Sequence, residues 1–384
     1  MSRLYPVRVI TARMGPAVVT LVTLFALLAL FCVVATVVPA GASGEVTMMI
    51  TGGIPRILNP HEPAGEPRHI EAHELWRMGG EFGDEEAALG FVTDVLVDER
   101  GYSYLLDSSF MVIRVVAPDG TYAYDIGRQG EGPGEFREAV DLVFLPDSTI
   151  GVVQIMPAKI IRLHRDGSPA PSCRLAQDDH GMSKIERTQS AGGHLVVGLM
   201  QPDFACNAVE HLLSFRASDG RQIQGVLQEE EIQPGGSINI GGDHTIEFTR
   251  YWGLGPDGRV YVAPEEHEYR IDIYGPDGKL ERVIKREYEP IQRSEEALAA
   301  DRKRAKELSA RFGGMVELEI REYARDIAAL YPRESGELWV ASSEGQREGP
   351  ANGIGDFDVF EAGGRFSHCL SIGADYDPER DAFS

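Results

Sequence analysis

The sequence has few cysteines and few basic residues, and each shortage excludes a class of function. Four cysteines occur in 384 residues, without a CxxC pair or a Cys/His cluster, so the chain carries no zinc-binding motif. Lysine and arginine number 37 against 60 acidic residues, which gives a net charge of −23. This charge repels phosphate backbones, and no basic patch with interleaved aromatic residues offsets it. We therefore exclude nucleic acid as a partner.

Nucleotide-binding and nucleophile motifs are also absent. The stretch "GRQGEGPGEF" (127–136) contains four glycines, a density that suggests a phosphate-binding loop. The residues that follow, "REAVDLVFL", have the pattern of a strand, whereas a dinucleotide fingerprint or a P-loop leads into a helix, and no Lys-Ser/Thr pair follows the glycines. We predict that these glycines turn a corner between two strands.

One long run lacks charge altogether. Residues 17–38, "AVVTLVTLFALLALFCVVATVV", are long enough to cross a bilayer as a helix. Arg3, Arg8 and Arg13 precede this run without any acidic residue, so we expect 1–16 to be cytoplasmic, 17–38 to be a transmembrane signal-anchor, and the rest to be extracytoplasmic, in the periplasm or at the cell surface of a bacterium. The alternative is a signal peptide that is cleaved near Ala42, which would release a secreted protein.

The residues after the apolar run are rich in proline and glycine. Residues 39–68 are interpreted as an extended linker. Beyond it, Cys173, Cys206 and Cys369 are expected to be buried or free thiols in an oxidising compartment, and a Cys173–Cys206 bridge is the alternative.

From residue 69 onward the sequence repeats two phrases in alternation. The first has the form "FVTDVLVDERGYSYLLD" (91–107) and the second the form "VIRVVAPDGTYAYDI" (112–126); each is a pair of alternating strands around a glycine-bearing turn. The turn glycines of the second phrase, Gly120, Gly167, Gly220 and Gly278, follow one another at intervals of 47, 53 and 58 residues. Four short strands in a unit of that size are typical of a propeller blade. We therefore predict an all-β propeller of four-stranded antiparallel blades over 69–384.

The next interval, from Gly278 to Gly364, is longer at 86 residues. It contains a polar segment, 293–314, with Ser294 placed as an N-cap, acidic residues in the first turn and Gly313 after the end. We predict a helix inserted between blades 4 and 5.

At this level the chain resembles a known family. The Gly-rich corner "GRQGEGPGEF", with "GPDGRVYVAP" (255–264) and "RIDIYGPDG" (270–278), is similar to the NHL-type repeat of six-bladed β-propellers, and in particular to exported bacterial six-bladed propeller proteins. The resemblance covers roughly 70–384. It implies a six-bladed fold and an exported location, and it implies no reaction.

Counting the phrases predicts how the ring closes. Five units are legible between Phe91 and Ile372, and "IEAHELWRM" (70–78) has the pattern of an outer strand of a sixth. The tail after Ile372 is too short to supply three more strands. We therefore expect an incomplete last blade, with the strand near 70–77 beside the first blade, a gap facing the fifth, and a natural chain that continues past Ser384. Five blades with a spare strand is the alternative.

Candidate site residues come from aligning the inner strands on their turns. The shared register contains Asp94, Asp141, Glu186, Tyr251 and Ala329. Carboxylates at one register of a propeller channel could bind a hard cation such as Ca²⁺, and the alternative is polar residues solvated by channel water. We predict a channel binding site formed by Asp94, Asp141, Glu186, Tyr251 and its neighbour Arg250, without a required cofactor.

The sequence therefore favours a membrane-anchored binding module that presents a propeller face to a protein, peptide or carbohydrate. A metal-dependent hydrolase or lyase in the channel is the alternative, and a structural component of a surface assembly is a third class. Contact with the membrane is expected through the N-terminal helix only.

Overall fold

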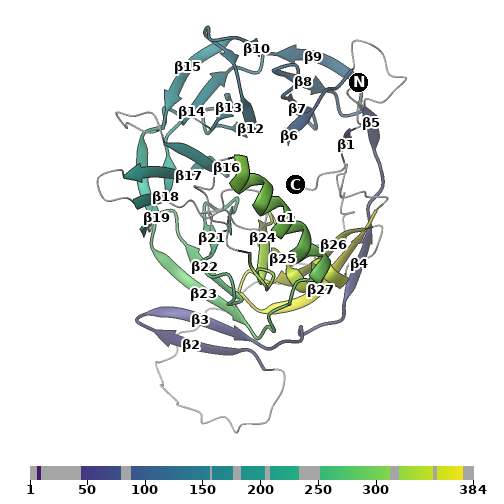
Figure 1. The fold of residues 1–384 in the computed structure, drawn as a ribbon, viewed down its shortest axis with the longest axis vertical. Coiled ribbons are helices and arrows are strands. Elements are labelled where there is room, and N and C mark those ends of the chain that lie inside the picture. Colours follow the sequence, from purple (N-terminus) through teal and green to yellow (C-terminus); the bar gives the residue numbers. More distant parts are fainter. Residues whose placement is uncertain are drawn as a thin grey trace, which may run out of the picture.

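The computed structural model describes residues 7–9, 45–78, 88–155, 158–175, 183–203, 208–232, 251–311, 320–348 and 353–374. Within these residues five four-stranded antiparallel units are arranged around a central axis (Figure 1), so the fold is an all-β propeller. Blades 1 and 2 consist of β6 (Val92–Val97), β7 (Ser103–Asp107), β8 (Val112–Val116) and β9 (Tyr122–Ile126), then β12 (Ala139–Phe144), β13 (Ile150–Gln154), β14 (Lys159–Leu163) and β15 (Pro169–Arg174). Blade 3 consists of β16 (Lys184–Ala191), β17 (His194–Asp203), β18 (Ala208–Arg216) and β19 (Gln222–Ile232). Blades 4 and 5 contain β20 (Tyr251–Leu254), β21 (Val260–Ala263), β22 (Arg270–Tyr274) and β23 (Leu280–Arg286), then β24 (Ile327–Pro332), β25 (Leu338–Ser342), β26 (Gly353–Phe360) and β27 (Phe366–Gly373).

The hairpins form because each turn contains a glycine in a left-handed conformation and an aspartate that accepts backbone hydrogen bonds. Gly120 and Gly167 have φ values of 86° and 83°, in the left-handed region that favours glycine. The aspartate before each glycine caps the turn: a carboxylate oxygen of Asp119 accepts from the backbone N–H of Thr121 at 3.0 Å, and one of Asp166 accepts from that of Ser168 at 2.9 Å. This local chemistry explains the second repeated phrase.

The glycine-rich stretch 127–136 is a corner, as predicted. It leaves the outer strand β9 and reaches the inner strand β12 through two short parallel strands, β10 (Arg128–Gln129) and β11 (Glu135–Phe136). Gly127 and Gly134 have φ values of 74° and 75°. Phe136 is fully buried between blades 1 and 2, so the corner also carries a core side chain.

The core is divided among the spaces between neighbouring blades. Ile113 of blade 1 packs in one cluster with Val152 of blade 2, and further clusters join blades 2 and 3, 3 and 4, and 4 and 5. Each inner face is apolar because alternate residues of the strands point to it. Both described cysteines, Cys173 and Cys369, are free thiols, and Cys206 lies outside the described residues.

The segment interpreted as a linker contains a hairpin, so the linker prediction is wrong for these residues. Strands β2 (Thr47–Thr51) and β3 (Ile54–Asn59) pair with each other, and β3 pairs in parallel with β23, which extends blade 4 to six strands. The Asn59 side chain fixes this addition: its Nδ2 donates to the Gly364 carbonyl at 2.9 Å, and its Oδ1 accepts from the Phe366 N–H at 2.8 Å. The composition of these residues suits a linker, but the outer strands of blades 4 and 5 offer free edges with which they pair.

The N-terminal segment also bridges blades 5 and 1 (Figure 1). Strand β4 (Arg68–Glu71) pairs in parallel with β27 of blade 5. Strand β5 (Trp76–Met78) packs on blade 1, where Met78 joins a cluster with Val116, and it pairs with β1 (Val7–Val9). Residues 7–9 therefore lie on the propeller, which contradicts the expectation that a membrane crossed by 17–38 separates them from it. The predicted position beside the first blade is thus confirmed for residues 76–78. It is wrong for residues 68–71, because β4 pairs with blade 5 on the side where a gap was expected. The described residues form five complete blades, so the six-bladed prediction is not confirmed.

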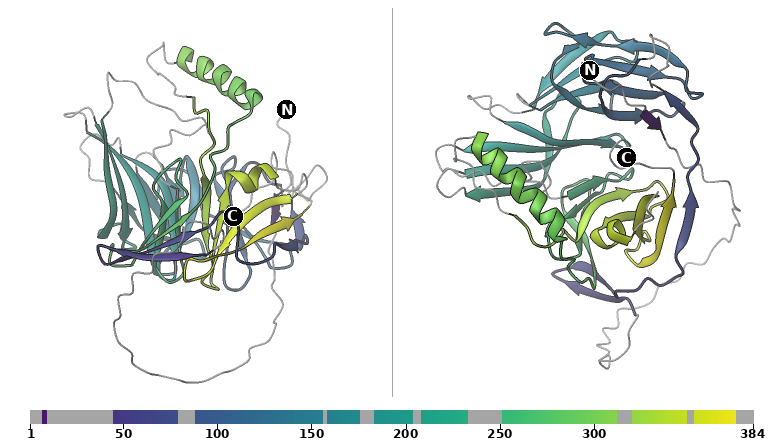
Figure 2. Two further views of the ribbon diagram at one scale, coloured as in Figure 1. Left: turned by 90° about the horizontal axis from the view of Figure 1, so that it is seen from below. Right: turned by 45° about the vertical axis from the view of Figure 1, so that its right-hand side comes forward.

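Two helices are described. α1 (Glu295–Arg311) lies between blades 4 and 5, as predicted for 293–314, and the Ser294 Oγ caps it by accepting from the Ala297 N–H at 3.2 Å. It rises from one face of the disc (Figure 2, left). α2 (Ser343–Glu348) was not predicted. Among the described residues no helix is long and apolar enough to cross a membrane, and the predicted anchor at 17–38 lies outside them.

Candidate functional site: the axial cluster

The inner strands β6, β12, β16, β20 and β24 line the axis (Figure 1), and their pairing with the second strand of each blade shows which residues are equivalent. In blades 1, 2, 3 and 5 the pairing between the inner strand and its neighbour shifts by one residue near the start of the strand. No such shift occurs in blade 4. Measured by their partners on the second strand, the equivalent residues are Asp94, Asp141, Arg187, Tyr251 and Ala329. Alignment on the turns predicts the same residues except in blade 3, where it places Glu186 at the register that Arg187 occupies.

Asp94 and Asp141 come together, although they are 47 positions apart in the sequence. The backbone N–H of Leu142 donates to Asp94 Oδ2 at 2.7 Å and to Asp141 Oδ1 at 3.0 Å. Burial, followed by the charge of Asp94 and a hydrogen bond to it, raises the pKa of Asp141 to about 8. At neutral pH Asp141 therefore keeps its proton and donates it in a hydrogen bond to Asp94.

Arg187 of blade 3 supplies the positive charge of the cluster. Its Nη1 donates to the Trp252 carbonyl at 2.8 Å, and its guanidinium carbon lies 5.4 Å from the centroid of the Trp252 ring. Burial lowers the pKa of Arg187, and the charges of Tyr331, Asp141 and Tyr251 act in the opposite direction. The guanidinium remains charged at neutral pH, since arginine titrates far above it.

Tyr251 contributes an aromatic face on the same side of the channel. The guanidinium of Arg325, which precedes β24, lies 4.4 Å from the Tyr251 ring centroid. Two carboxyl groups, two guanidinium groups and two tyrosines are thereby gathered from all five blades. We call the set Asp94, Asp141, Arg187, Tyr251, Arg325 and Tyr331 the axial cluster.

Glu186 does not join the axial cluster. It occupies the bulge position of β16, and its Oε1 lies 3.2 Å from Nδ1 of His211 on β18. Arg250 lies outside the described residues. In the part of the chain that the structure describes, no group of three His, Cys, Asp or Glu side chains is arranged for a metal ion. The three-carboxylate ring is therefore not formed, and calcium binding by Asp94 and Asp141 stays a prediction.

Sequence reasoning missed Arg187 and Arg325. Arg187 is adjacent to the predicted Glu186, and the length of the turn in blade 3 exchanges the two. Four residues separate the paired Ser190 and Leu195, whereas five separate Val97 and Ser103 in blade 1, so counting back from the turn glycine stops one residue too early in the chain.

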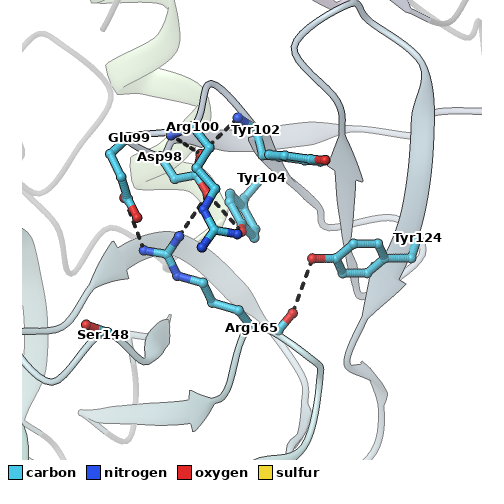
Figure 3. A pocket seen from close by; sticks show the side chains of 8 residues that line it. All are labelled: Asp98, Glu99, Arg100, Tyr102, Tyr104, Tyr124, Ser148 and Arg165. Atoms are coloured by element: carbon cyan, nitrogen blue, oxygen red, sulfur yellow. Dashed lines mark hydrogen bonds and ion pairs between the residues drawn. The ribbon is translucent and has the colours of Figure 1, made fainter.

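A cavity of about 410 Å³ lies between blades 1 and 2, and Figure 3 shows its lining residues. Arg165 Nη1 donates to Asp98 Oδ2 at 2.8 Å, and the Tyr104 hydroxyl donates to the same oxygen at 3.3 Å. Burial, with the charge of Asp98 next in size, raises the pKa of Tyr104 to about 12. Because the ion pair of Asp98 with Arg165 joins blade 1 to blade 2, we interpret these contacts as a structural link between the two blades.

No protein-family model and no curated protein matches the chain. Among solved structures, the chain is similar to a protein of Bacteroides fragilis that is described as exported, with 11% identity, 79% of each chain covered and a TM-score of 0.44. It is also similar to virginiamycin B lyase from Staphylococcus aureus (11% identity, 76% of this chain and 74% of that chain, TM-score 0.36) and to a calcium-binding protein, regucalcin, from Agrobacterium tumefaciens (9%, 74% and 77%, TM-score 0.37).

These similarities are too distant to assign an activity or a family, and the NHL-type family stays a resemblance. The arrangement of the sheets shows that the described residues form a five-bladed β-propeller.

Proposed function

We propose that the protein is an extracytoplasmic binding module whose axial cluster binds an uncharged polar ligand such as a peptide or a carbohydrate. The observation that carries this proposal is the Asp94–Asp141 pair. Two carboxyl groups brought together beside a half-buried guanidinium lower the stability of the fold relative to apolar residues of similar size. Strongly perturbed titratable groups in a channel are typical of functional sites.

The chemistry of the cluster indicates the kind of ligand. Protonated Asp141 and Arg187 are donors, Asp94 is an acceptor, and the hydroxyl group of Tyr251 can act as either. Hydroxyl and amide groups, which both donate and accept, match this mixture. The Tyr251 ring offers an apolar surface against which a sugar or a side chain can pack.

The test is a binding screen with a matched pair of variants. Soluble peptides and oligosaccharides are screened by thermal shift, and each hit is titrated by calorimetry against wild type, Asp94→Asn and Asp119→Asn. Asp119 is an exposed turn residue of blade 1 far from the axis, so its variant controls for general effects of removing a carboxylate. We expect Asp94→Asn to weaken binding at least tenfold and Asp119→Asn to leave it unchanged. A ligand that binds Asp94→Asn as tightly as wild type would place binding elsewhere.

One observation favours an enzyme as the second candidate. A carboxyl group with a pKa of about 8 is suited to general acid catalysis near neutral pH, and Asp94 could accept a proton in the same step. In a hydrolase or lyase of this kind, Asp141→Asn would abolish turnover while ligand binding persisted. A Ca²⁺-dependent version predicts that the purified protein contains calcium and that added calcium raises the melting temperature more at pH 8 than at pH 5, because the cation favours the ionised form of Asp141.

A further inference from the structure

The cavity between blades 1 and 2 carries polar groups that the link between Asp98 and Arg165 leaves unused (Figure 3). Asp98 itself is saturated, since each of its two carboxylate oxygens accepts two hydrogen bonds. Arg100 and Ser148 also line the cavity. Within the part of the chain that the structure describes, no hydrogen bond or ion pair engages the Arg100 guanidinium or the Ser148 hydroxyl. Both groups are therefore open to a ligand.

The other blades provide an internal comparison for Ser148. In each of them the turn between the first and second strands has a glycine at this position, with φ between 78° and 84°; these are Gly101, Gly193, Gly258 and Gly336. Ser148 has the same left-handed conformation, with φ of 66°, which is strained for a residue that carries a side chain. The turn by itself favours glycine here, so the serine hydroxyl is present at a cost in stability.

Arg100 also departs from the repeat. In blades 2, 4 and 5 its position has a short polar residue whose side-chain oxygen accepts from the backbone N–H two residues further on. These residues are Asp147, Asp257 and Ser335. Blade 1 caps the same turn with Asp98, which accepts from the Tyr102 N–H at 2.9 Å, and this leaves Arg100 without a role in the turn. Two polar residues that the turns do not require thus meet at one cavity.

The open groups indicate an anionic ligand. Arg100, Ser148 and the remaining N–H groups of Arg165 are donors, whereas Glu99, whose side chain is 72% exposed, is the main acceptor among the lining side chains. A guanidinium binds a carboxylate through two parallel hydrogen bonds. The carboxylates of Asp98 and Glu99 and the net charge of −23 disfavour a dianion such as phosphate. These features together favour a monocarboxylate.

Two tyrosine rings of the cavity suit the apolar part of such a ligand (Figure 3). Tyr124 is 40% exposed, and its hydroxyl donates to the Arg165 carbonyl oxygen at 3.3 Å, which holds the ring in place. Tyr102 is half-buried. Flat apolar groups pack well on aromatic rings, and a volume of about 410 Å³ is in the range of small-molecule sites.

We propose that this cavity binds a small monocarboxylate with a flat apolar body. The carboxylate contacts Arg100 and Ser148, and the body packs against Tyr102 and Tyr124. The site is separate from the axial cluster, because Asp94 lies near the start of β6 and the cavity lies beyond its end, about 10 Å further along the strand. The proposal therefore does not depend on the function proposed for the axis.

The test is calorimetric titration of the full chain with benzoate, and with benzamide as a neutral analogue of the same shape. We expect benzamide to bind at least tenfold more weakly than benzoate, because it lacks the charge that the guanidinium recognises. Arg100→Gln keeps a polar side chain of similar length and should weaken benzoate binding at least tenfold. Arg302→Gln is the control, since it changes an arginine of α1 whose side chain is 53% exposed, and it should leave benzoate binding unchanged.

Ser148→Gly gives a second readout. The variant should melt at a higher temperature than wild type without ligand, because glycine adopts the left-handed conformation without strain. It should also bind benzoate at least threefold more weakly, because a donor is lost. A serine with a purely structural role would not combine higher stability with weaker binding.

Four results would overturn the proposal. They are no benzoate binding at millimolar concentrations, equal binding of benzoate and benzamide, benzoate binding that Arg100→Gln leaves unchanged, and tighter binding of inorganic phosphate than of benzoate. The melting temperature of Arg100→Gln without ligand verifies that the variant is folded, and we expect it to equal that of wild type because the guanidinium has no partner in the described chain.

Discussion

Replacing Asp141 by asparagine tests the electrostatics of the axial cluster. The raised pKa, about 8 against a usual value of 3.8, means that at pH 7 the folded protein holds a proton at Asp141 that the unfolded chain has released. Stability from this group is complete below pH 4 and is lost as the pH rises from about 4 to 8, because unfolding releases the proton more readily at higher pH. Asparagine has no proton to lose, and its amide N–H can still donate to Asp94.

The size of the effect follows from the pKa difference. Each pH unit between the two pKa values is worth about 1.4 kcal/mol, which sets an upper limit of about 4 kcal/mol at pH 7. Asparagine replaces the O–H donor to Asp94 by a weaker N–H donor, which offsets part of this gain, and we expect about half that amount, about 2 kcal/mol. The corresponding rise in melting temperature is about 3–5 °C for a domain of this size.

The assay is thermal and urea unfolding of wild type and Asp141→Asn at pH 5, 7 and 8. We expect the stability gained by the variant to increase steadily over this range. Asp119→Asn is the control: hydrogen bonds to the Thr121 side chain and backbone lower the pKa of Asp119 below its usual value, so the effect of that variant should be flat above pH 5. A gain that is equal at pH 5 and pH 8, or a loss of stability at pH 8, would refute the shared-proton account of Asp94 and Asp141.

Three further experiments test the fold and the N-terminal segment. Gly134→Val should cost about 1–3 kcal/mol in urea unfolding, because φ is 75° and the new Cβ would lie 2.9 Å from a Leu163 methyl carbon, whereas Gly132→Val should cost less, because its Cβ would meet only the movable end of a glutamate. Arg286→Ala should cost about 3–5 kcal/mol, because it strands the buried Asp358 carboxylate that its Nη1 contacts at 2.7 Å, and Arg286→Ala combined with Asp358→Asn should cost less than the sum of the single variants. Mass spectrometry of the purified protein should find the N-terminal peptide intact, because Val7–Val9 pairs with β5, whereas a mature chain that begins at Ser43 would contradict that pairing.

The strands, the turns and the inserted helix were predictable because their causes are local. Alternation along five residues decides which side chains face the core, and the Asp-Gly turn depends on one carboxylate and one left-handed glycine. The Ser294 cap likewise involves neighbours within one turn. Such features are complete within a few residues, so a single sequence suffices to locate them.

The course of the N-terminal strands depended on distant partners. Residues 47–59 and 68–71 joined blades 4 and 5 because the outer strands β23 and β27 had free hydrogen-bonding edges. Nothing within the segments themselves specifies that pairing, since their composition suits a linker equally well. The blade count changed for the same reason, because a strand predicted for a sixth blade was used to bridge two complete ones.

By itself, the sequence determined the propeller class, the corner at 127–136, the position of α1 and the pairing of Asp94 with Asp141 at one register. Only the tertiary structure decided that Arg187, and not Glu186, faces them. The turn between β16 and β17 is one residue shorter than the corresponding turn of blade 1, and a shift of one residue in register moves a side chain to the opposite face of its strand. That register depends on how the two strands pair with each other, which neither strand encodes alone.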